Sequence, residues 1–383
     1  MPFTALAADL DARRATHLYR QRRIVQGPQG AQIDVDGRRL ANFCSNDYLG
    51  LANHPDIVAA AQAGAARWGV GSGASHLVCG HTAAHEAMET RLAAFVGKPA
   101  ALSLATGYMA NLAAVTALVG RGDAIFADKL NHASLNDACQ LSNAAFKRFA
   151  HNDLEQLERL LATTDARRRL IVVDAVFSMD GDCAPLAEII RLAERYDAWV
   201  YADDAHGFGV LGEGRGSAVG IDSPRLIYMA TLGKAAGVAG AFIAAEPVVI
   251  DYLVNTARPY IYTTAAPALL AEAVLVSVDL IEREGWRRER LNEHIATLRA
   301  ALVSTPAQLL PSHTPIQPLL VADSAVALAL ADGLRDAGHW VAAIRPPTVP
   351  TPRLRICLSA AHMAADVAKL GADLAGLLNG HVK

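Results

Sequence analysis

A lysine that follows an apolar run is the side chain in this sequence best suited to covalent chemistry. Lys234 ends the tetrapeptide TLGK, which begins directly after the apolar residues 226–230. Burying an unpaired ammonium group is costly, and a Schiff base removes the charge because it converts the amine into an imine. The alternative is a lysine whose ammonium group reaches back to the protein surface. For Lys234 taken alone, both interpretations stay open.

Two further polar residues follow another apolar run, at residues 199–202. Asp203 and His206 belong to the sequence DDAHG. In parallel α/β sheets, ligands bind beyond the carboxyl ends of the strands. A carboxylate there can keep a pyridine nitrogen protonated, which makes the ring an electron sink, and the histidine can hydrogen-bond a phenolic oxygen. The alternative is a turn with a helix-capping aspartate.

Three other short motifs can contact the same kind of ligand. Gly107 and Tyr108 stand between an apolar run and a helical pattern. Backbone N–H groups at such a helix N-terminus bind phosphate, and glycine allows a close approach. His132 can stack on a planar ring, and Ser178 can donate to a ring oxygen. Each of these residues is also typical of an ordinary loop or turn.

These residues lie on or next to an alternating series of strands and helices. We predict strands at 100–104, 170–173, 199–202 and 226–230. We predict helices at 83–96, 108–119 and 186–196. Strands that alternate with helices indicate a parallel sheet, so the predicted fold class is α/β with a mainly parallel central sheet flanked by helices.

The two ends of the chain have different patterns. Residues 1–25 are typical of a helix with a basic side, and residues 31–43 of a short β segment with a turn at Asp36-Gly37. After residue 270 long helices precede short strands, which indicates a smaller α+β domain. We therefore expect three parts, residues 1–45, 46–270 and 271–383.

Composition limits the class of protein. The 383 residues are 52% hydrophobic and 19% charged, as in a packed globular enzyme, and the net charge of −3 argues against nucleic-acid binding. We see no apolar run that could cross a membrane and no secretory signal. The five cysteines have no CxxC spacing, which predicts a reduced, cytoplasmic protein. The 13 histidines show no metal spacing, because the sequence HEAME at 85–89 ends in Glu89, so we expect no metal.

The order of the candidate residues along one α/β domain is more specific than any single residue. From about Leu10 to His362 the sequence resembles the α-oxoamine synthases, a family of fold-type I enzymes that use pyridoxal 5′-phosphate (PLP). The most specific motifs are SNDYLGL at 45–51, FSMDGD at 177–182, DDAHGFGVLG at 203–212, GRG at 214–216 and TLGK at 231–234. The resemblance implies a PLP-dependent acyltransferase that is a homodimer with its active site at the subunit interface.

The resemblance implies a role for each residue around the PLP ring. Lys234 would form the Schiff base and move protons at the Cα atom of the substrate. Asp203 would pair with the pyridine nitrogen, and His206 with the phenolic oxygen. His132 would stack on the ring, and Ser178 would hydrogen-bond near the ring oxygen. The implied catalytic residues are Lys234, His132, Asp203 and His206.

The resemblance also implies a phosphate site. Thr231 and the backbone of Gly107 and Tyr108 would hold the phosphate of PLP. In a homodimer, Thr263 or Thr264 could reach the phosphate bound by the other subunit.

Four segments narrow the resemblance to one reaction. They are LDARR at 10–14, FAHND at 149–153, APLAE at 184–188 and AIRPPTVP at 343–350. They imply condensation of L-alanine with pimeloyl-CoA, or with pimeloyl-[acyl-carrier protein], in biotin synthesis. Arg20 would meet the acyl substrate, Asn46 and Arg355 the amino-acid carboxylate, and Thr348 would line the substrate site, with Arg345 as the alternative to Arg355. A glycine-using relative and a PLP-fold scaffold subunit are the competing hypotheses.

Overall fold

The chain forms two compact units. The computed structural model describes residues 3–16, 18–306 and 308–381. One unit combines Met1–Ser45 with Asn292–Lys383, and the other is Asn46–Leu291. The predicted boundary after residue 45 therefore coincides with a boundary between units. The N-terminal part, which we predicted as a separate region, shares a unit with the C-terminal part.

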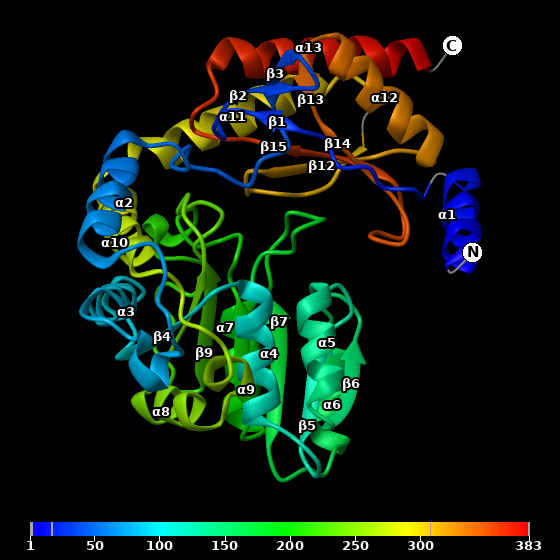
Figure 1. Cartoon of the computed structure of the whole chain (residues 1–383). Helices are drawn as coiled ribbons and strands as arrows, with labels where there is room; N and C mark the ends of the chain where they lie inside the picture. Colours follow the sequence, from blue (N-terminus) through cyan, green and yellow to red (C-terminus); the bar gives the residue numbers. More distant parts are fainter. Residues whose placement is uncertain (1–2, 17, 307, 382–383) are drawn as a thin grey trace. The chain divides into compact units, whose positions relative to one another are not determined.

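The larger unit is built on a seven-stranded sheet (Figure 1). In chain order its strands are β4 (Ala100–Leu104), β5 (Ala124–Asp128), β6 (Ala145–Phe149), β7 (Arg169–Asp174), β8 (Trp199–Asp203), β9 (Leu226–Thr231) and β10 (Ala241–Ala245). Across the sheet the order is β4-β10-β9-β8-β7-β5-β6. The neighbours from β9 to β6 run parallel, whereas β10 is antiparallel to β4 and β9. The predicted α/β class with a mainly parallel sheet is confirmed.

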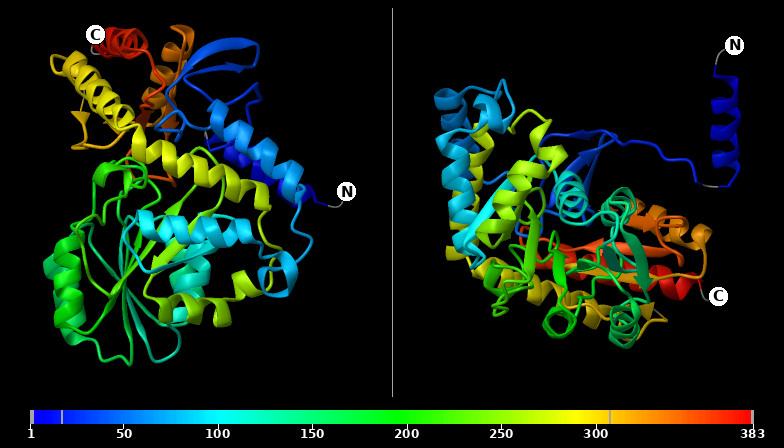
Figure 2. Two further views of the ribbon diagram at one scale, coloured as in Figure 1. Left: turned by 90° about the vertical axis from the view of Figure 1, so that its left-hand side faces the viewer. Right: turned by 90° about the horizontal axis from the view of Figure 1, so that it is seen from below.

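Both faces of this sheet are apolar, so both need helices. On β7, Leu170 and Val172 belong to one buried cluster, and Ile171 and Val173 belong to another. Successive strand side chains point to opposite faces, which explains why the strands read as continuous apolar runs. The helices of the first cluster are α4 (Gly107–Leu118), α5 (Ala133–Leu141), α8 (Pro247–Thr256) and α9 (Arg258–Ile261). The helices of the second cluster are α6 (Leu154–Thr163) and α7 (Leu186–Arg195), and Figure 2 shows helices on both sides of the strands.

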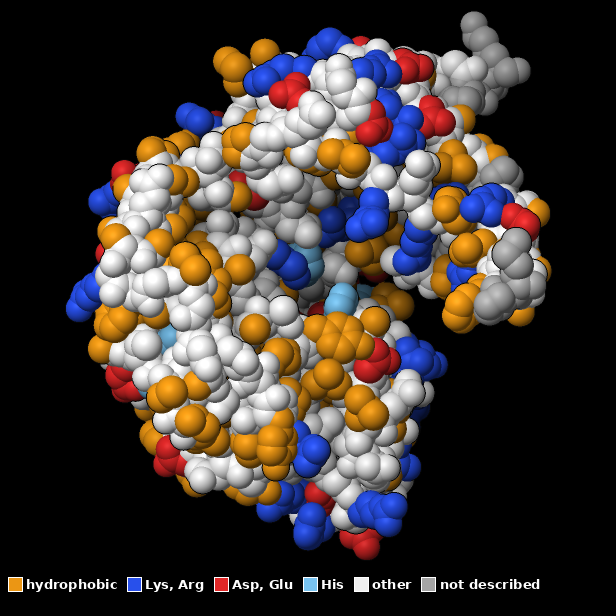
Figure 3. Space-filling view, in the orientation of Figure 1, with side chains coloured by type: hydrophobic (Ala, Val, Ile, Leu, Met, Phe, Trp, Pro, Cys, Tyr) orange, Lys and Arg blue, Asp and Glu red, His pale blue; other side chains and the backbone are white. Residues whose placement is uncertain are grey.

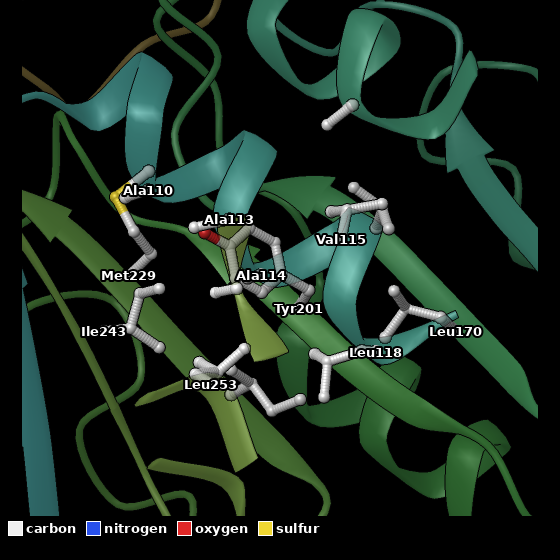
Figure 4. Packing of buried hydrophobic residues seen from close by; sticks show 14 of the residues in the cluster. Ala110, Ala113, Ala114, Val115, Leu118, Leu170, Tyr201, Met229, Ile243 and Leu253 are labelled. Carbon is white, nitrogen blue, oxygen red and sulfur yellow. The ribbon is translucent and has the colours of Figure 1, made fainter. Parts of the chain in front are cut away.

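Helix α4 packs small side chains directly on the sheet. Ala110, Ala113 and Ala114 are fully buried. They face Met229 of β9 and Tyr201 of β8 (Figure 4). Small side chains allow this close packing without voids. The packing holds the N-terminus of α4 at the carboxyl ends of the strands.

Helix α10 (Ala268–Arg283) belongs to the larger unit, which corrects the predicted boundary at residue 270. It packs against α2 (Pro55–Trp68) and α3 (Ala83–Phe95). A Cβ added at Gly64 of α2 would lie 2.9 Å from the Cα atom of Leu269, so the two helices approach too closely for a side chain. The sequence pattern predicts this helix but does not show its partner. The boundary lies instead within α11 (Trp286–Leu302).

The smaller unit contains two four-stranded sheets and has α+β character. The first has the order β1 (Val25–Gln26), β2 (Gln32–Val35), β3 (Arg38–Asn42) and β13 (His339–Trp340). The second has the order β11 (Gln308–Leu309), β12 (Ile316–Leu320), β15 (Arg353–Cys357) and β14 (Ala342–Ile344). Helix α12 (Ser324–Asp336) follows β12 in the chain, and helix α13 (Ala364–His381) follows β15. The predicted turn at Asp36-Gly37 joins β2 and β3, with φ values of 52° and 77° that suit a two-residue hairpin.

The predicted helix over residues 1–25 is too long. Helix α1 spans Thr4–Ala15, and the hydroxyl of Thr16 donates to the carbonyl of Ala12 at its end. Arg20 follows in an irregular segment that leads to β1. Because no residue of α1 is buried, no apolar periodicity marks where the helix stops.

Charges of both signs are interspersed on the face shown in Figure 3. At the surface of the larger unit, Arg195 forms an exposed ion pair with Glu158. Exposed pairs of this kind contribute little to stability. Among the described residues, no helix is long and apolar enough to cross a membrane.

Candidate active site

A cavity of about 210 Å³ lies at the carboxyl ends of the parallel strands of the larger unit. Asp174 ends β7, Asp203 ends β8 and Thr231 ends β9. The lining residues are mostly polar: Gly107, Tyr108, Asn111, His132, Ser134, Asp174, Ser178, Asp203, Ala205, His206, Thr231 and Lys234. The cavity therefore brings together the residues of one chain that we predicted around the PLP ring and its phosphate, whereas Thr263 and Thr264 do not line it.

The Lys234 amine belongs to a chain of hydrogen-bonded groups. Its Nζ atom lies 2.9 Å from Nε2 of His206. The other ring nitrogen of His206 lies 2.7 Å from the hydroxyl of Tyr48, which in turn donates to Oδ1 of Asn46 at 3.1 Å. Tyr48 is fully buried and was not among the predicted site residues. A proton at Nζ is thus connected to two further groups that can donate and accept.

The Asp203 carboxylate is held on both of its oxygens. Oδ1 accepts from the backbone N–H of Ala205 at 3.0 Å, and Oδ2 accepts from Nδ2 of Asn111 at 2.8 Å. Asn111 also donates to Ser134 and accepts from the hydroxyl of Tyr201. This network fixes the carboxylate at the floor of the cavity.

Asp174 places a second carboxyl group next to Asp203, since the two residues are directly paired between β7 and β8. Burial, and then the charge of Asp203, hold the pKa of Asp174 well above its usual range. Asp174 accepts from the backbone N–H of His132 at 2.6 Å. Burial lowers the pKa of His132, so this ring is neutral near pH 7. The raised pKa favours the neutral form of Asp174 beside the Asp203 carboxylate.

The neighbouring Asp204 does not belong to the cavity. Its oxygens accept from the backbone N–H of Ser217 at 2.7 Å and from the hydroxyl of Tyr228 at 2.8 Å. Burial raises its pKa to about 6. Asp204 therefore ties the loop after β8 to its surroundings, and only Asp203 of the pair faces the cavity.

The opening of α4 forms a cradle opposite Thr231. Thr106 caps the helix by accepting from the N–H of Met109. A Cβ added at Gly107 would lie 2.5 Å from Cγ2 of Thr231, so a larger residue there would displace the Thr231 side chain. Tyr108 is partly exposed, and its hydroxyl donates to Asp137. Helix N–H groups, a hydroxyl and a missing side chain together fit a phosphate group.

The predicted substrate residues Arg20, Thr348 and Arg355 belong to the smaller unit. The guanidinium of Arg20 donates to the hydroxyl of Thr348 at 3.0 Å, and both line a cavity of about 590 Å³. Arg345 lines the same cavity. Arg355 lies on β15, where it is buried and donates to Cys357 at 2.9 Å. The structure therefore groups Arg20 with Thr348 and Arg345, and not with Arg355.

The sequence patterns did not identify three residues that line the cavity: Asn111, Ser134 and Asp174. Asn111 lies four residues after Gly107, so one helical turn brings it to the same side of α4. Asp174 ends a predicted strand, as Asp203 does. Both signals were present, but a polar residue within a helix or at a strand end is usually structural.

A lysine, a histidine and a buried carboxylate at the carboxyl ends of a mainly parallel sheet define a PLP-dependent enzyme of fold type I. The chain belongs to the aminotransferase class I and II family, whose model matches residues 38–373. It is 59% identical to an 8-amino-7-oxononanoate synthase from Nitrosomonas europaea over 380 residues, covering 97% of this chain and 98% of the relative. It is 60% identical to the 8-amino-7-oxononanoate synthase of Chromobacterium violaceum over 358 residues, covering 92% of each.

Solved structures share the fold over almost the whole chain. A serine palmitoyltransferase from Sphingomonas wittichii is 29% identical, with a TM-score of 0.93 over 99% of this chain and 97% of that one. An 8-amino-7-oxononanoate synthase from Francisella tularensis is 28% identical, with a TM-score of 0.78 over 90% of this chain and 99% of that one. A further solved structure, described as SPT with a PLP internal aldimine, is 27% identical to this chain. Its TM-score is 0.93 over 99% of this chain and 98% of that one. PLP is therefore the cofactor.

Proposed function

We propose that this protein is an 8-amino-7-oxononanoate synthase, which joins L-alanine to a pimeloyl thioester with loss of CO2 in biotin biosynthesis. The observation that supports this function most strongly is the cavity lined by Lys234, His206 and Asp203. The chain that forms it is 59% identical to an 8-amino-7-oxononanoate synthase. The overall reaction converts alanine and the pimeloyl thioester into the amino ketone, CO2 and the free thiol.

Lys234 is the residue that would hold PLP and the base that would take the proton from Cα of alanine. When bound, PLP supplies an electron-accepting ring that stabilises negative charge at Cα. A base needs a lone pair at Nζ, and the 2.9 Å contact with His206 lets the proton at Nζ be shared. Tyr48 extends this contact, since it lies 2.7 Å from the other ring nitrogen.

Asp203 would pair with the pyridine nitrogen, because an anion at this position keeps that nitrogen protonated. Asn111 and the backbone of Ala205 orient its oxygens. Burial and the charge of Asp203 raise the pKa of Asp174, which favours its neutral form and so disfavours a second negative charge in the site. His132 would stack on the ring, and His206 and Ser178 would contact its oxygen.

The cradle of Gly107, Tyr108 and Thr231 would hold the phosphate of PLP. Its backbone N–H groups stand at a helix N-terminus, where the helix dipole favours negative charge. The close approach of Gly107 to Thr231 supports this assignment. In a homodimer, Thr263 or Thr264, from the segment between α9 (Arg258–Ile261) and α10, would add a hydroxyl from the partner subunit.

The cavity of the smaller unit would take the acyl substrate. It is lined by Arg13, Arg20 and Arg345, together with Thr348. Three guanidinium groups around about 590 Å³ suit an anionic ligand, such as the free carboxylate of a pimeloyl chain. This supports the proposed role of Arg20 and Thr348.

Asn46 and Arg355 would bind the carboxylate of alanine. Arg355 is only 6% exposed, and a buried guanidinium binds a carboxylate strongly. One of its acceptors is the Cys357 sulfur, and sulfur is a weaker acceptor than a carboxylate oxygen. Arg345 stays the alternative, and its place beside Arg20 favours the acyl group instead.

Three further properties belong to the proposal. We infer a homodimer, and pimeloyl-CoA or pimeloyl-[acyl-carrier protein] as the acyl donor. We also infer a cytoplasmic location, which the five free cysteines support.

A substrate panel tests the function. L-Alanine, glycine and L-serine are each assayed with pimeloyl-CoA, acetyl-CoA and palmitoyl-CoA, and products are identified by mass spectrometry. We expect the highest kcat/KM for alanine with pimeloyl-CoA. Preference for glycine with acetyl-CoA would favour a 2-amino-3-ketobutyrate CoA ligase, and purified protein without PLP or any turnover would favour a PLP-fold scaffold subunit.

A further inference from the structure

Three histidines that are spread over ten residues of sequence come together at the start of α3 in the larger unit. His76 begins the short π-helical turn η1 (His76–Gly80), His81 follows that turn, and His85 lies in the first turn of α3. One ring nitrogen of each lies within 4.8 Å of the others, and the Nδ1 atoms of His76 and His81 are 3.0 Å apart. The ring centroids are 5.1 to 5.5 Å apart.

We propose that His76, His81 and His85 form a binding site for a divalent transition-metal ion, with Zn²⁺ as the expected ion. Three imidazoles and one water complete a tetrahedral zinc site. With Zn–N distances near 2.0–2.1 Å, tetrahedral ligand atoms lie roughly 3.4 Å apart, so small side-chain shifts suffice. None of the three histidines lines the PLP cavity.

The outer nitrogens of two rings are already held in the manner of metal ligands. Nε2 of His85 donates to the carbonyl of Ala266 at 2.9 Å, and Nε2 of His81 lies 3.3 Å from a carboxylate oxygen of Glu86. Such contacts to a carbonyl or carboxylate fix the ring and turn the other nitrogen toward the metal. Nδ1 of His85 accepts from the N–H of Thr82 at 3.2 Å, so it carries a lone pair that an ion could take over.

The third ring is fixed by stacking. His76 lies against Tyr260 with ring centroids 4.9 Å apart and an angle of 15° between the planes. This stacking fixes the plane of the His76 ring, whose Nδ1 atom lies 3.0 Å from Nδ1 of His81.

Carboxylates stand close enough to balance the charge of the ion. His81, Glu86 and Glu89 form a second group whose ligand atoms lie within 4.8 Å of one another. Glu89 is buried and already accepts from the backbone and hydroxyl of Ser103. Glu86 is mostly exposed, and it is the group that would approach the ion or its water. This negative charge offsets the positive end of the helix dipole at the start of α3.

Cobalt binding tests the site, because tetrahedral Co²⁺ absorbs visible light where Zn²⁺ does not. The PLP-loaded full chain is treated with a chelator, dialysed and titrated with CoCl2, then with ZnCl2. We expect one Co²⁺ per chain with tetrahedral absorption bands, displaced by Zn²⁺. In His81→Asn we expect an affinity at least 10-fold lower. His54→Asn is the matched control, since His54 caps α2 instead, and it should bind like the unmodified protein.

Two outcomes would overturn the proposal. One is the absence of stoichiometric Co²⁺ binding by the unmodified protein, and the other is unchanged binding by His81→Asn, which would place the ion on PLP or elsewhere. His81 is half-buried and its replacement is the least disruptive of the three. Melting temperatures give a second measurement that does not require His76→Asn or His85→Asn to fold. ZnCl2 should raise the Tm of the unmodified protein and of His54→Asn. It should not raise the Tm of His81→Asn.

Discussion

Asn111 links the Asp203 carboxylate to the helix that covers the sheet, through hydrogen bonds to Asp203, Ser134 and Tyr201. We predict that Asn111→Ala lowers kcat about 10- to 100-fold, because a hydrogen bond to a charged group contributes roughly 1.5–3 kcal/mol. The affinity for PLP should fall less, since Lys234 and the phosphate cradle are unchanged. Steady-state kinetics and a PLP titration measure both effects.

The matched control is Thr116→Ala on the same helix, where the hydroxyl bonds only to the carbonyl of Leu112 among the described contacts. It should keep turnover within twofold. Equal losses in the two variants would mean that Asn111 acts through helix stability and not through Asp203.

At the residue scale, the sequence predicted the side chains that line the cavity better than those that support them. Lys234, Asp203 and His206 follow predicted strands, and a strand end predicts a position at the rim of a parallel sheet. Asn111 and Tyr48 reach the site because α4 and the segment before α2 fold onto it. That contact depends on tertiary packing, which no local pattern contains.

At the scale of elements, His151 connects three strand ends. Its Nδ1 lies 3.2 Å from both oxygens of Asp128, which ends β5, and its Nε2 lies 2.7 Å from Asp182. Asp182 belongs to the turn after β7 that carries Ser178 of the PLP cavity. Burial alone would lower the pKa of His151, but its hydrogen bonds to the two carboxylates raise that pKa to about 10.

This raised pKa predicts a pH-dependent stability. The unfolded pKa is near 6.5, so the contribution is fully present below about pH 6.5 and is lost as pH rises towards 10. We expect His151→Ala to lower the free energy of unfolding by about 2–4 kcal/mol at pH 6 and by clearly less at pH 10. Urea unfolding at several pH values measures the difference.

The control is His54→Ala, in which the lost group is an acceptor for the N–H of Asp56. The difference in free energy of unfolding between His54→Ala and the unmodified protein should not become smaller as the pH rises from 6 to 10. A loss for His151→Ala that is the same at pH 6 and pH 10 would show that His151 stabilises the turn without its charge.

The elements themselves were predicted with unequal success. Strand β4 and helix α7 were found because apolar runs and periodicity mark them. The helix predicted over residues 1–25 was wrong for residues 18–25, since an exposed helix has no buried stripe to mark its end, and residues 1, 2 and 17 lie outside the described chain. The predicted boundary at residue 270 was wrong because the sequence of α10 shows only a helical pattern. It does not show that α10 packs against α2 of the larger unit.

At the scale of the whole molecule, the proposed homodimer predicts complementation between two inactive variants. Lys234→Ala is co-expressed with the double variant Thr263→Val/Thr264→Val. If each site uses Lys234 of one subunit and a threonine of the other, a hybrid dimer contains one intact site. Half of randomly formed dimers are hybrids with one of two sites intact, so activity should reach about a quarter of the unmodified level.

Each variant alone should have little activity, and sedimentation should give twice the chain mass. A mixture no more active than the two separate variants would show that the threonines serve the site of their own subunit. A monomer in sedimentation would reject the shared site altogether.

The proposed reaction is a decarboxylative condensation of L-alanine with a pimeloyl thioester. It is tested most directly with L-alanine labelled with ¹³C at C1, C2 or C3, pimeloyl-CoA and the PLP-loaded protein. We predict that the C1 label leaves only as ¹³CO2, in equal amount to the product and the released CoA thiol, while the C2 and C3 labels are retained in 8-amino-7-oxononanoate. A product that keeps the C1 label, or CoA release without ¹³CO2, would contradict the proposed reaction.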